Sequence, residues 1–428
     1  MRMTGRVRLL VAVSAVVLAG IPAVSAMAAG KVCDVKKYGA KGDGTTKDTV
    51  AVQKAIDACT EGKGGGTVEV PAGTFVIAPI LLKSNMTLHL AKDATLLGSP
   101  DMADFPKGLF ARHPTVQPLV SSLNAENITI NGEGTIDGNG HIWWDYVRGV
   151  RNSGVLGTDH PRPMGVVFDH SKHIVMEGVT VQNAGFWQIV PYYAEDLVFR
   201  NIRILAPPSP NTDAIDPFSS SDIVIDHVFS SVGDDNIAIK SGEINSPGPD
   251  NPSKNIKITD CTFENGHGLS IGSEIAGGVQ NVHAERIHFK GTDQGIRIKS
   301  ARDRGNDVSN ISYKDITMED VKTAILVTEY YPFPAPAGEV PAEPVGRLTP
   351  KFHNITIENV TATNSGSAGY IVGLPESPVM DMTLKNVHLA GKTGLAVAYA
   401  KVTMDDVTVK PDTGEAIKVA PTATVTKK

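Results

Sequence analysis

The sequence predicts an all-β, single-domain, right-handed parallel β-helix with an N-terminal capping helix. A short pattern of alternating apolar residues recurs along the chain, roughly every twenty to thirty residues, and little of the chain shows helical periodicity. Period-two alternation indicates strands with one buried face, and a repeat of this length indicates a stacked array. Strands wound into a coil can each pair with their equivalents about 4.8 Å above and below.

Each copy of the repeat opens with a polar residue, usually Asn or Asp, followed by alternating apolar positions. The opening residues are Asn127, His173, Asp196, Asp222, Asn255, Asn281, Asn310, Asn354, Asp381 and Lys401. The leucine scaffold of leucine-rich repeats and the Trp-Asp signature of propeller blades are both absent from the sequence. A coil of short strands therefore remains as the predicted architecture.

The N-terminus has the pattern of a secretory signal. Its basic residues are Arg2, Arg6 and Arg8. The apolar stretch Leu9–Leu18 and the small residues Ala26–Ala28 follow, as in a cleavable signal peptide. We expect residues 1–28 to be removed and 29–428 to form the catalytic domain of a secreted protein, extracellular or periplasmic, with net charge −6 − 3 = −9. A retained membrane anchor is the alternative.

The first part of the mature chain is expected to close one end of the solenoid. Asp48–Cys59 is the best amphipathic helix in the chain, and a helix there would cover an open strand edge. Gly64–Val70 is predicted to start the first coil. Cys33 and Cys59 flank this segment and could form a disulfide, which would leave Cys261 as a buried free thiol.

Two insertions interrupt the repeat and are predicted to be loops. Trp143–Pro163 is polar and contains arginines, and Tyr330–Pro350 is rich in proline. Long loops on a solenoid usually line its binding face, although a plain surface excursion is the other interpretation.

Composition excludes several classes of protein. With 41% hydrophobic and 20% charged residues, the chain is neither disordered nor a polytopic membrane protein. A net charge of −6 gives no global basic field for nucleic acid. We expect no nucleic-acid or membrane partner, no cofactor and no metal, since no Cys/His spacing resembles a zinc site. A capped solenoid of this kind is expected to be a monomer.

Aligned on their apolar positions, four coils place a set of polar residues in one column. The stacked apolar residues are Ile215, Ile237, Leu269 and Ile296, and the column two positions earlier is Asp213, Asp235, His267 and Gln294. Asp234 lies beside Asp235, and Arg297 and Lys299 point outward from the next strand. Alternation alone would bury Asp235 with Ile237, so we expect a turn to break the alternation.

This clustering of charge indicates acid–base chemistry. Carboxylates so close together cannot all ionise at their ordinary pKa values, and one is expected to stay protonated. A protonated acid beside an ionised base is what glycoside hydrolysis requires. Each short motif alone is typical of a turn or a solvated strand face, but their coincidence in one column favours a site.

At these residues the sequence resembles the bacterial-type polygalacturonases, or pectinases, of glycoside hydrolase family 28, which have the pectin lyase-like solenoid fold. The four motifs that carry the resemblance appear in order: Asn211-Thr212-Asp213, Gly233-Asp234-Asp235, Gly266-His267-Gly268 and Arg297-Ile298-Lys299. The flanking segments match as well, and the resemblance covers nearly the whole mature chain. One departure is Ala214, where the family usually has glycine.

The resemblance implies a metal-free hydrolase that cleaves α-1,4-linked galacturonan with inversion, so that pectic polysaccharide is its partner. Asp234 would be the general acid, and Asp213 and Asp235 would activate the water. His267 would sustain the protonation pattern of the carboxylates. Inversion requires the acid and base to lie roughly 6.5–9.5 Å apart, and residues on adjacent coils are compatible with that gap.

The resemblance also implies which residues bind the substrate. Arg297 and Lys299 would hold the carboxylate of galacturonate at the cleavage point, and Asn211 would contribute as well. The tyrosine of the family's site matches Tyr330 best, although Tyr331 is adjacent.

Several activities occur on solenoids of this kind. Endo action is expected because no further domain precedes the coils, and exo action is the main alternative. A rhamnogalacturonan hydrolase typically lacks two of the four motifs. A pectate lyase needs a calcium-holding acid cluster and an arginine base, and a non-catalytic adhesin or carbohydrate-binding module has no reason to keep all four motifs.

Overall fold

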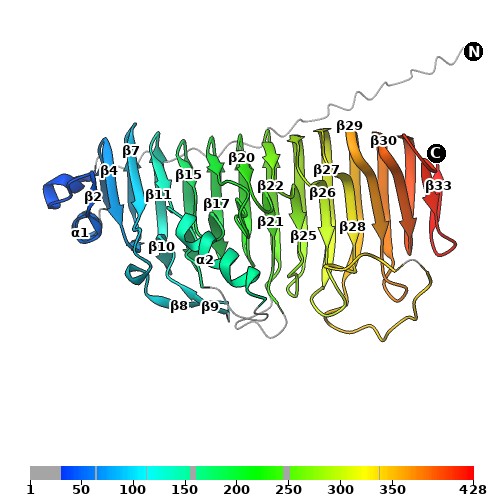
Figure 1. Ribbon diagram of the computed structural model, residues 1–428, viewed down its shortest axis with the longest axis horizontal. Helices are drawn as coiled ribbons and strands as arrows, with labels where there is room; N and C mark the ends of the chain where they lie inside the picture. Colours follow the sequence, from blue (N-terminus) through cyan, green and yellow to red (C-terminus); the bar gives the residue numbers. More distant parts are fainter. Residues whose placement is uncertain (1–29, 63–64, 112, 155–160, 244–250, 337) are drawn as a thin grey trace, which may run out of the picture.

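The protein is a long stack of parallel coils. The computed structural model describes residues 30–62, 65–111, 113–154, 161–243, 251–336 and 338–428. The coils run from helix α1 (Thr49–Cys59) at one end to strand β33 (Thr424–Lys427) at the other (Figure 1). The predicted right-handed parallel β-helix is confirmed. The predicted signal peptide lies outside the described residues, in which no helix is long and apolar enough to cross a membrane.

Each complete coil contributes to three rows of parallel strands. The first row is β1 (Lys31–Asp34), β3 (Gly66–Val70), β6 (Met86–Leu90), β11 (Glu126–Gly132), β14 (Lys172–Glu177), β17 (Glu195–Arg200), β19 (Ser221–Asp226) and β22 (Ser253–Thr259). The second row is β2 (Asp43–Lys47), β4 (Gly73–Ile77), β7 (Ala94–Gly98), β12 (Thr135–Asp137), β15 (Thr180–Gln182), β18 (Arg203–Leu205), β20 (Phe229–Val232) and β23 (Thr262–Asn265).

The third row carries the site described below. It contains β5 (Ile80–Leu82), β10 (Val120–Leu123), β13 (Val166–Asp169), β16 (Ile189–Tyr192), β21 (Ile237–Ile239), β24 (Leu269–Ile271), β26 (Gln294–Lys299) and β28 (Thr323–Thr328). The predicted apolar column is confirmed here, because Ile215 pairs with Ile237, Ile237 with Leu269, and Leu269 with Ile296.

Strands toward the C-terminus are longer than predicted, because they bend through the corners without a break in pairing. These strands are β25 (Val279–Lys290), β27 (Asp307–Glu319), β29 (Lys351–Val372), β30 (Val379–Ala398) and β31 (Ala400–Pro411), and two short strands, β32 (Ile417–Val419) and β33, finish the stack. Outside the coils lie the antiparallel hairpin of β8 (Lys107–Phe110) and β9 (His113–Val116) and the short 3₁₀ helix η2 (Met102–Asp104). A second 3₁₀ helix, η1 (Val35–Tyr38), joins β1 to β2 and buries Val35.

A ladder of polar residues at one corner explains the opening position of the repeat. Nine of the ten opening residues have left-handed backbones with φ between 49° and 58°, a conformation that Asn and Asp tolerate. Their side chains also bond from coil to coil: the Asn281 amide donates to Asn255 at 3.0 Å, and Asn310 donates to Asn281 at 3.1 Å. The repeat is therefore the sequence signature of the corner, with apolar residues filling the interior of each coil.

The N-terminal cap forms as predicted, but the first coil begins earlier. Helix α1 follows Asp48 and buries Val52 and Ile56 against the core. The predicted disulfide between Cys33 and Cys59 is confirmed, and Cys261 is a buried free thiol. Strand β1 already pairs with β3, so the coil does not start at Gly64–Val70.

The insertion Trp143–Pro163 was predicted to be a loop, and this is wrong for its first half. Helix α2 spans His141–Asn152 and packs across the coils (Figure 1). The helix buries Trp143, Trp144 and Val147, and the indole of Trp144 donates to the carbonyl of Ala184 at 3.1 Å. These three apolar residues share one helical face, a period that the polar composition of the segment obscures. The insertion Tyr330–Pro350 has no strand or helix among its described residues.

Candidate active site

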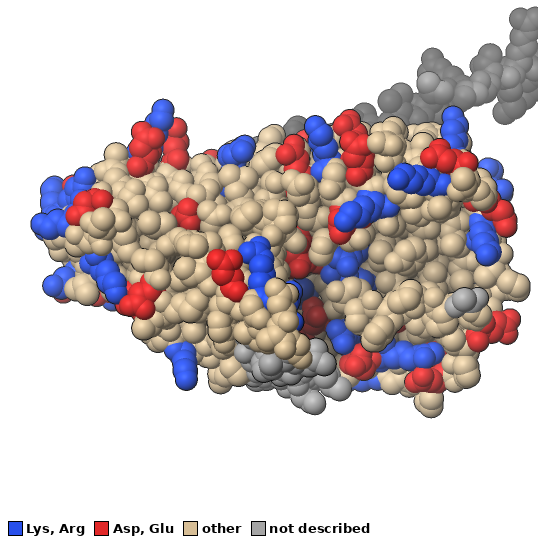
Figure 2. Space-filling view, in the orientation of Figure 1, with Lys and Arg blue, Asp and Glu red and all other residues tan. Residues whose placement is uncertain are grey.

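The predicted column of polar residues lies on the outward side of the third strand row. Asp213 precedes Ile215, Asp235 precedes β21, and His267 precedes β24, so three successive coils each contribute from a turn. The backbone amide of Ala214 donates to the carbonyl of Asp235 at 2.9 Å, which places the first two turns directly next to each other. Figure 2 shows acidic and basic side chains meeting in a hollow near the middle of the long axis.

The turn before β21 breaks the strand alternation, as predicted for Asp235. The side chain of Asn236 lies inside the coil, where its amide donates to Ser230 at 2.9 Å and its oxygen accepts from the amide of Gly268 at 2.9 Å. Asn236 and Ile237 therefore both face inward, and Asp235 is left on the outward side with Ser270. A buried amide that bonds to the next coil thus holds the turn in place.

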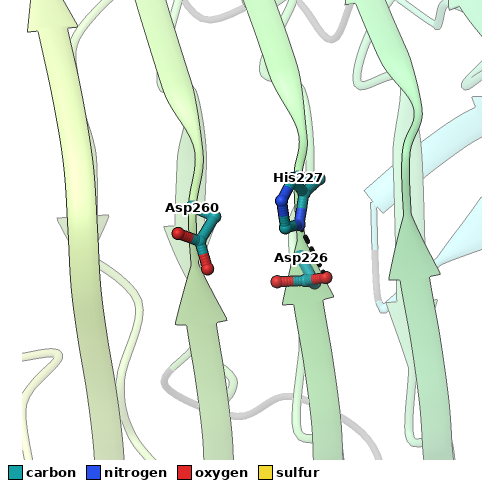
Figure 3. Close-up of side chains that lie close together, drawn as sticks. All are labelled: Asp226, His227 and Asp260. Carbon is teal, nitrogen blue, oxygen red and sulfur yellow. Dashed lines mark hydrogen bonds and ion pairs between the residues drawn. The ribbon is translucent and has the colours of Figure 1, made fainter.

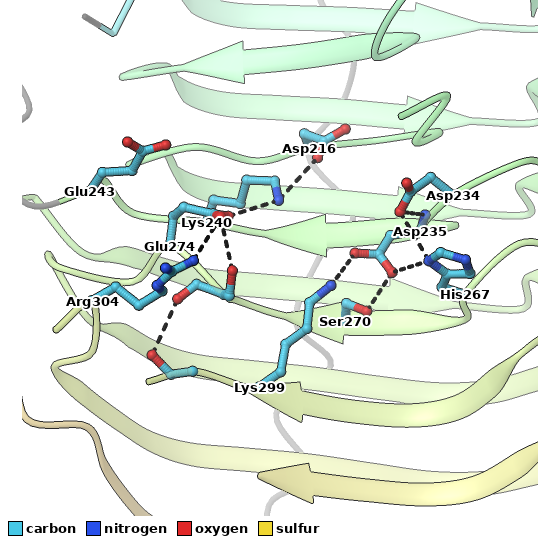
Figure 4. A network of polar contacts seen from close by, with 12 residues as sticks. Asp216, Asp234, Asp235, Lys240, Glu243, His267, Ser270, Glu274, Lys299 and Arg304 are labelled. Atoms are coloured by element: carbon cyan, nitrogen blue, oxygen red, sulfur yellow. Dashed lines mark hydrogen bonds and ion pairs between the residues drawn. The ribbon is translucent and has the colours of Figure 1, made fainter. Parts of the chain in front are cut away.

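Asp235 lies at the centre of a buried charge cluster. Lys299 Nζ donates to Oδ2 and the Ser270 hydroxyl to Oδ1, both at 2.8 Å (Figure 4). Arg297 Nη1 also donates to Oδ1 at 2.8 Å. The Asp235 side chain is 1% exposed, and those of Arg297 and Lys299 are 9% and 5% exposed. Burial acts to raise the pKa of Asp235, but the charges of Lys299 and Arg297 outweigh it and lower the pKa. Asp235 is accordingly held as a carboxylate.

A threonine hydroxyl links the two turns that carry the aspartates. The buried Thr212 donates from Oγ1 to the carbonyl of Ser209 at 2.9 Å and accepts from the amide of Gly233 at 3.1 Å. The motif Asn211-Thr212-Asp213 is therefore bonded to Gly233-Asp234-Asp235 through its middle residue. This bond fixes the separation of Asp213 from the Asp234–Asp235 pair.

Asp213 differs from Asp235 in its surroundings. It is 3% exposed, and its Oδ1 has no hydrogen-bond partner among the described residues. Burial raises the pKa of Asp213 well above its usual range, and the charges of Asp234 and Asp216 add to this, while Lys240 opposes it. The sequence predicted one raised carboxyl in the cluster, and the raised pKa of Asp213 agrees with that expectation. The predicted roles, however, placed the proton on Asp234.

His267 joins the acids across the hollow. Its Nδ1 lies 3.0 Å from Asp234 Oδ1 and 3.8 Å from Asp235 Oδ1, and its Nε2 lies 3.7 Å from Asp293 Oδ2. Burial alone would lower the pKa of His267, but the hydrogen bond with Asp234 and the charges of both aspartates raise it above its ordinary value. The structure thus brings the four predicted catalytic residues together.

The predicted binding residues fall into two places. Tyr331 lies over the cations, with its ring centre 5.5 Å from the guanidinium of Arg297 and 5.0 Å from Lys299 Nζ. Tyr330 instead lines a separate cavity with Pro336 and Tyr399. The structure therefore favours Tyr331 over the predicted Tyr330 as the tyrosine of the site.

The side chain of Asn211 accepts hydrogen bonds from two arginines that were not among the site residues predicted from the sequence. Its Oδ1 accepts from Arg162 Nη2 at 2.9 Å and from Arg151 Nη2 at 3.3 Å. Arg162 is 5% exposed and also interacts with the charges of Asp213 and Asp234. The only signal in the sequence was the arginine content of the insertion before Pro163.

A second buried cluster, Asp216, Lys240 and Glu274, lies at the other end of the same strands (Figure 4). Lys240 Nζ is 3.1 Å from Glu274 Oε2 and 3.9 Å from Asp216 Oδ1. Burial would raise the pKa of Glu274, but the charge of Lys240 lowers it to about 2. Burial raises the pKa of Asp216, against the effect of Lys240. In the sequence, Asp216 and Lys240 stood out only as residues that flank the motifs.

Two groups of described residues have the spacing of metal ligands, and both have other partners. Asp226, His227 and Asp260 lie on neighbouring coils at the surface (Figure 3). Both carboxylate oxygens of Asp260 accept hydrogen bonds from Arg286 at 2.7 Å. One oxygen of Asp226 bonds to His227 and the other accepts from the hydroxyl of Thr259. The second group is Asp234, Asp235 and His267, in which Asp235 already accepts from two cations.

The fold and this constellation define a carbohydrate-cleaving hydrolase of the β-helix class. The sequence profile of Glycosyl hydrolases family 28 matches residues 59–416, and the chain belongs to that family. The match spans all four motifs of the site.

Similar proteins agree with this assignment. The chain is 31% identical to a probable polygalacturonase of Vitis vinifera over 83% of this chain and 74% of that one. It is 28% identical to an endo-polygalacturonase of Pectobacterium carotovorum subsp. carotovorum, over 82% and 85%. It is similar to the crystal structure of an exopolygalacturonase from Thermotoga maritima, with 27% identity, a TM-score of 0.76 and coverage of 90% and 93%.

Proposed function

We propose that this protein is a secreted, monomeric polygalacturonase that hydrolyses α-1,4 bonds between galacturonate units of homogalacturonan with inversion of the anomeric carbon. The observation that supports this most strongly is the arrangement of Asp213, Asp234 and Asp235 on two bonded turns, with His267 on one side and two cations on the other. Both endo- and exo-acting relatives are similar to the chain, so similarity alone does not distinguish the mode of attack.

The geometry supports a division of roles among the carboxyl groups. Asp234 is the most exposed of the three aspartates in the cluster and bonds to His267, so it is placed to protonate the leaving glycosidic oxygen. Asp235 is held ionised by Lys299 and Arg297, and Asp213 lies one coil away. Asp235 would deprotonate water on the opposite face of the sugar ring, and Asp213 would help to orient that water.

The two cations would also recognise the acidic polymer. Each makes one bond to Asp235, and an ammonium has three donors and a guanidinium five. The remaining donors can meet the carboxylate of a galacturonate unit, with the ring of Tyr331 beside it. Recognition of this kind requires a free carboxylate, so methyl-esterified units should bind less well.

Two walls beside the hollow favour the exo alternative over the endo mode that the sequence suggested. On the N-terminal side, the hairpin β8–β9 is joined by His113 to Glu243 at 2.8 Å, and a cavity of about 260 Å³ lies between the hairpin, Arg162 and Trp187. On the C-terminal side, Tyr331 covers the cations. Walls on both sides leave less room for a polymer to run through, so we propose release of short products from a chain end.

Product analysis tests activity, stereochemistry and mode together. Wild-type protein should release reducing sugar from polygalacturonate, with initial inversion of the anomeric configuration in proton NMR and one small product accumulating from the start. Asp234→Asn should lose more than nine-tenths of kcat while remaining folded, because an amide cannot donate the proton. A retained configuration or a fully active Asp234→Asn would contradict the mechanism. A broad early mixture of oligomers would restore the endo mode.

A further inference from the structure

Three arginines from the inserted segment converge on the chain just before Asp213. Arg148 Nη2 on helix α2 donates to the carbonyl of Pro208 at 3.1 Å and to the hydroxyl of Ser209 at 2.8 Å. Arg151 on the same helix donates to Asn211. Arg162 follows the helix and donates to the same stretch. Each of the four residues from 208 to 211 thus accepts a hydrogen bond from an arginine of the insertion.

Arg162 makes the most contacts of the three and is the most buried. Its Nη1 donates to the carbonyls of Gly185 at 3.2 Å and Pro210 at 2.6 Å, and its Nη2 donates to Asn211 Oδ1. The guanidinium stacks over the ring of Phe186 at 4.5 Å. The planar fork therefore joins two coils at once, which a single ammonium could not do.

The residues that Arg162 holds, Pro210 and Asn211, determine where Asp213 lies. Asn211 has a left-handed backbone with φ of 58°, and its side chain is fixed by the arginines. Thr212, the next residue, is bonded to both Ser209 and Gly233. A shift at Pro210 or Asn211 would therefore move Asp213 relative to the turn that carries Asp234 and Asp235.

Arg162 also supplies a positive charge where negative charges dominate. The groups that face Asp213 are the acids Asp234, Asp235 and Asp216 and the cations Lys240 and Arg162. Burial, together with Arg151, lowers the pKa of Arg162 to about 10, and Asp213 and Asp234 act against that lowering. Arg162 thus stays charged at neutral pH and, by the same interaction, favours the ionised form of Asp213.

We propose that Arg162 is a positioning residue for hydrolysis, which holds the Asn211-Thr212-Asp213 turn against Gly233-Asp234-Asp235 and places a positive charge near Asp213. This inference rests on the proposed role of Asp213 in activating water. Helix α2 assists through Arg148 and Arg151. Because both hydrogens of Nη1 point at carbonyl oxygens and Nε is buried, Arg162 has little capacity left to bind substrate directly.

Variants of Arg162 separate its two contributions. Arg162→Gln removes both the fork and the charge, and Arg162→Lys removes only the fork. The control is Arg203→Gln on β18, because the exposed Arg203 also stacks over a phenylalanine, Phe229, at 4.5 Å but belongs to the second strand row. For each protein, kcat and KM on polygalacturonate are measured from acidic to neutral pH, together with the melting temperature.

We expect Arg162→Gln to lower kcat at least ten-fold with KM changed by less than about three-fold, since misplaced catalytic groups lose rate rather than affinity. The acidic limb of its kcat/KM profile should move to higher pH, because Asp213 then binds a proton more readily. Arg162→Lys should lower kcat to a smaller extent, and the acidic limb of its kcat/KM profile should coincide with that of the wild type. Arg203→Gln should behave like wild type.

Other outcomes would overturn the inference. A raised KM with unchanged kcat in Arg162→Gln would make Arg162 a substrate contact. If the acidic limb of the kcat/KM profile does not move in Arg162→Gln, Arg162 has no electrostatic effect on Asp213. Equal losses of kcat in Arg162→Gln and Arg203→Gln would indicate general destabilisation. If Arg162→Gln does not fold, a wild-type rate in Arg162→Lys is the overturning result. Absence of wild-type activity would instead count against the proposed function.

Discussion

Lys299 is buried against Asp235, and replacing it with methionine should destabilise the protein even without substrate. The two side chains are 5% and 1% exposed, with Nζ and Oδ2 2.8 Å apart. Methionine has a similar length and no charge, so Lys299→Met leaves Oδ2 of a buried carboxylate without its donor. Arg297 and Ser270 still bond to Oδ1.

The expected loss follows from this geometry. Breaking a buried ion pair by removing one partner costs about 3–5 kcal/mol, and we expect about 3 kcal/mol here because Asp235 keeps its bond to Arg297. An unfolding entropy of about 2.1 cal/mol/K per residue gives about 0.8 kcal/mol/K for the 428 − 28 = 400 residues of the expected mature chain. The melting temperature should therefore fall by about 4 °C at neutral pH, which differential scanning fluorimetry or circular dichroism can measure.

The deficit should depend on pH in a defined direction. Burial acts to raise the pKa of Asp235, but Lys299 and Arg297 lower it in the folded protein. Such a group stabilises the fold above its unfolded pKa of about 3.9 and loses that contribution as the pH falls through the folded value. Without Lys299 the folded pKa rises, so Asp235 in the variant takes up a proton earlier. The gap between wild type and variant should be largest near pH 7 and smaller near pH 4.

A double variant provides the control. Asp235→Asn combined with Lys299→Met removes the uncompensated charge, so it should be more stable than the sum of the two single losses predicts. The reasoning is refuted if Lys299→Met melts with wild type at neutral pH, if its deficit is the same at both pH values, or if the two substitutions are additive.

Three further predictions concern binding, the cap and the corner ladder. Lys299→Ala and Arg297→Ala should each raise KM for polygalacturonate roughly ten-fold, since a charge-assisted bond contributes about 1.5–3 kcal/mol. On fully methyl-esterified pectin, the activity of the variants should be close to that of the wild type. An unchanged KM and kcat on polygalacturonate would exclude a role for these cations in binding the galacturonate carboxylate. Cys33→Ser should lower the melting temperature, because closing a 26-residue separation contributes about 3.5 kcal/mol; alkylation of Cys33 and Cys59 in the native, unreduced protein would contradict the bond. Asn281→Ala should be less stable than Asn281→Gly by about 1–2 kcal/mol, because alanine resists a φ of 56°; equal melting temperatures would show that the backbone conformation carries no cost.

Much of the fold could be predicted from the sequence because its determinants are local and repeated. The residue that opens each repeat, such as Asn255 or Asn281, is selected by a left-handed corner, and the apolar residues after it are selected by the coil interior. Stacking then follows from equal spacing, which is why Ile215, Ile237, Leu269 and Ile296 could be aligned from their spacing alone. The same alignment placed Asp213, Asp235 and His267 together.

Other features depended on contacts between segments far apart in the chain. No local pattern distinguished Tyr331 from Tyr330, because the choice depends on which ring faces the cations on β26. Helix α2 forms where its tryptophans can be buried, and burial is a property of the assembled coils. The contact of Arg162 with Asn211 spans 49 residues, and the bonds of Arg297 and Lys299 to Asp235 span more than 60. The sequence by itself therefore determined the coil, its corners and the column of candidate catalytic groups. Tertiary structure decided how those groups are charged, since pKa values depend on burial and on neighbours that only the folded chain brings within reach.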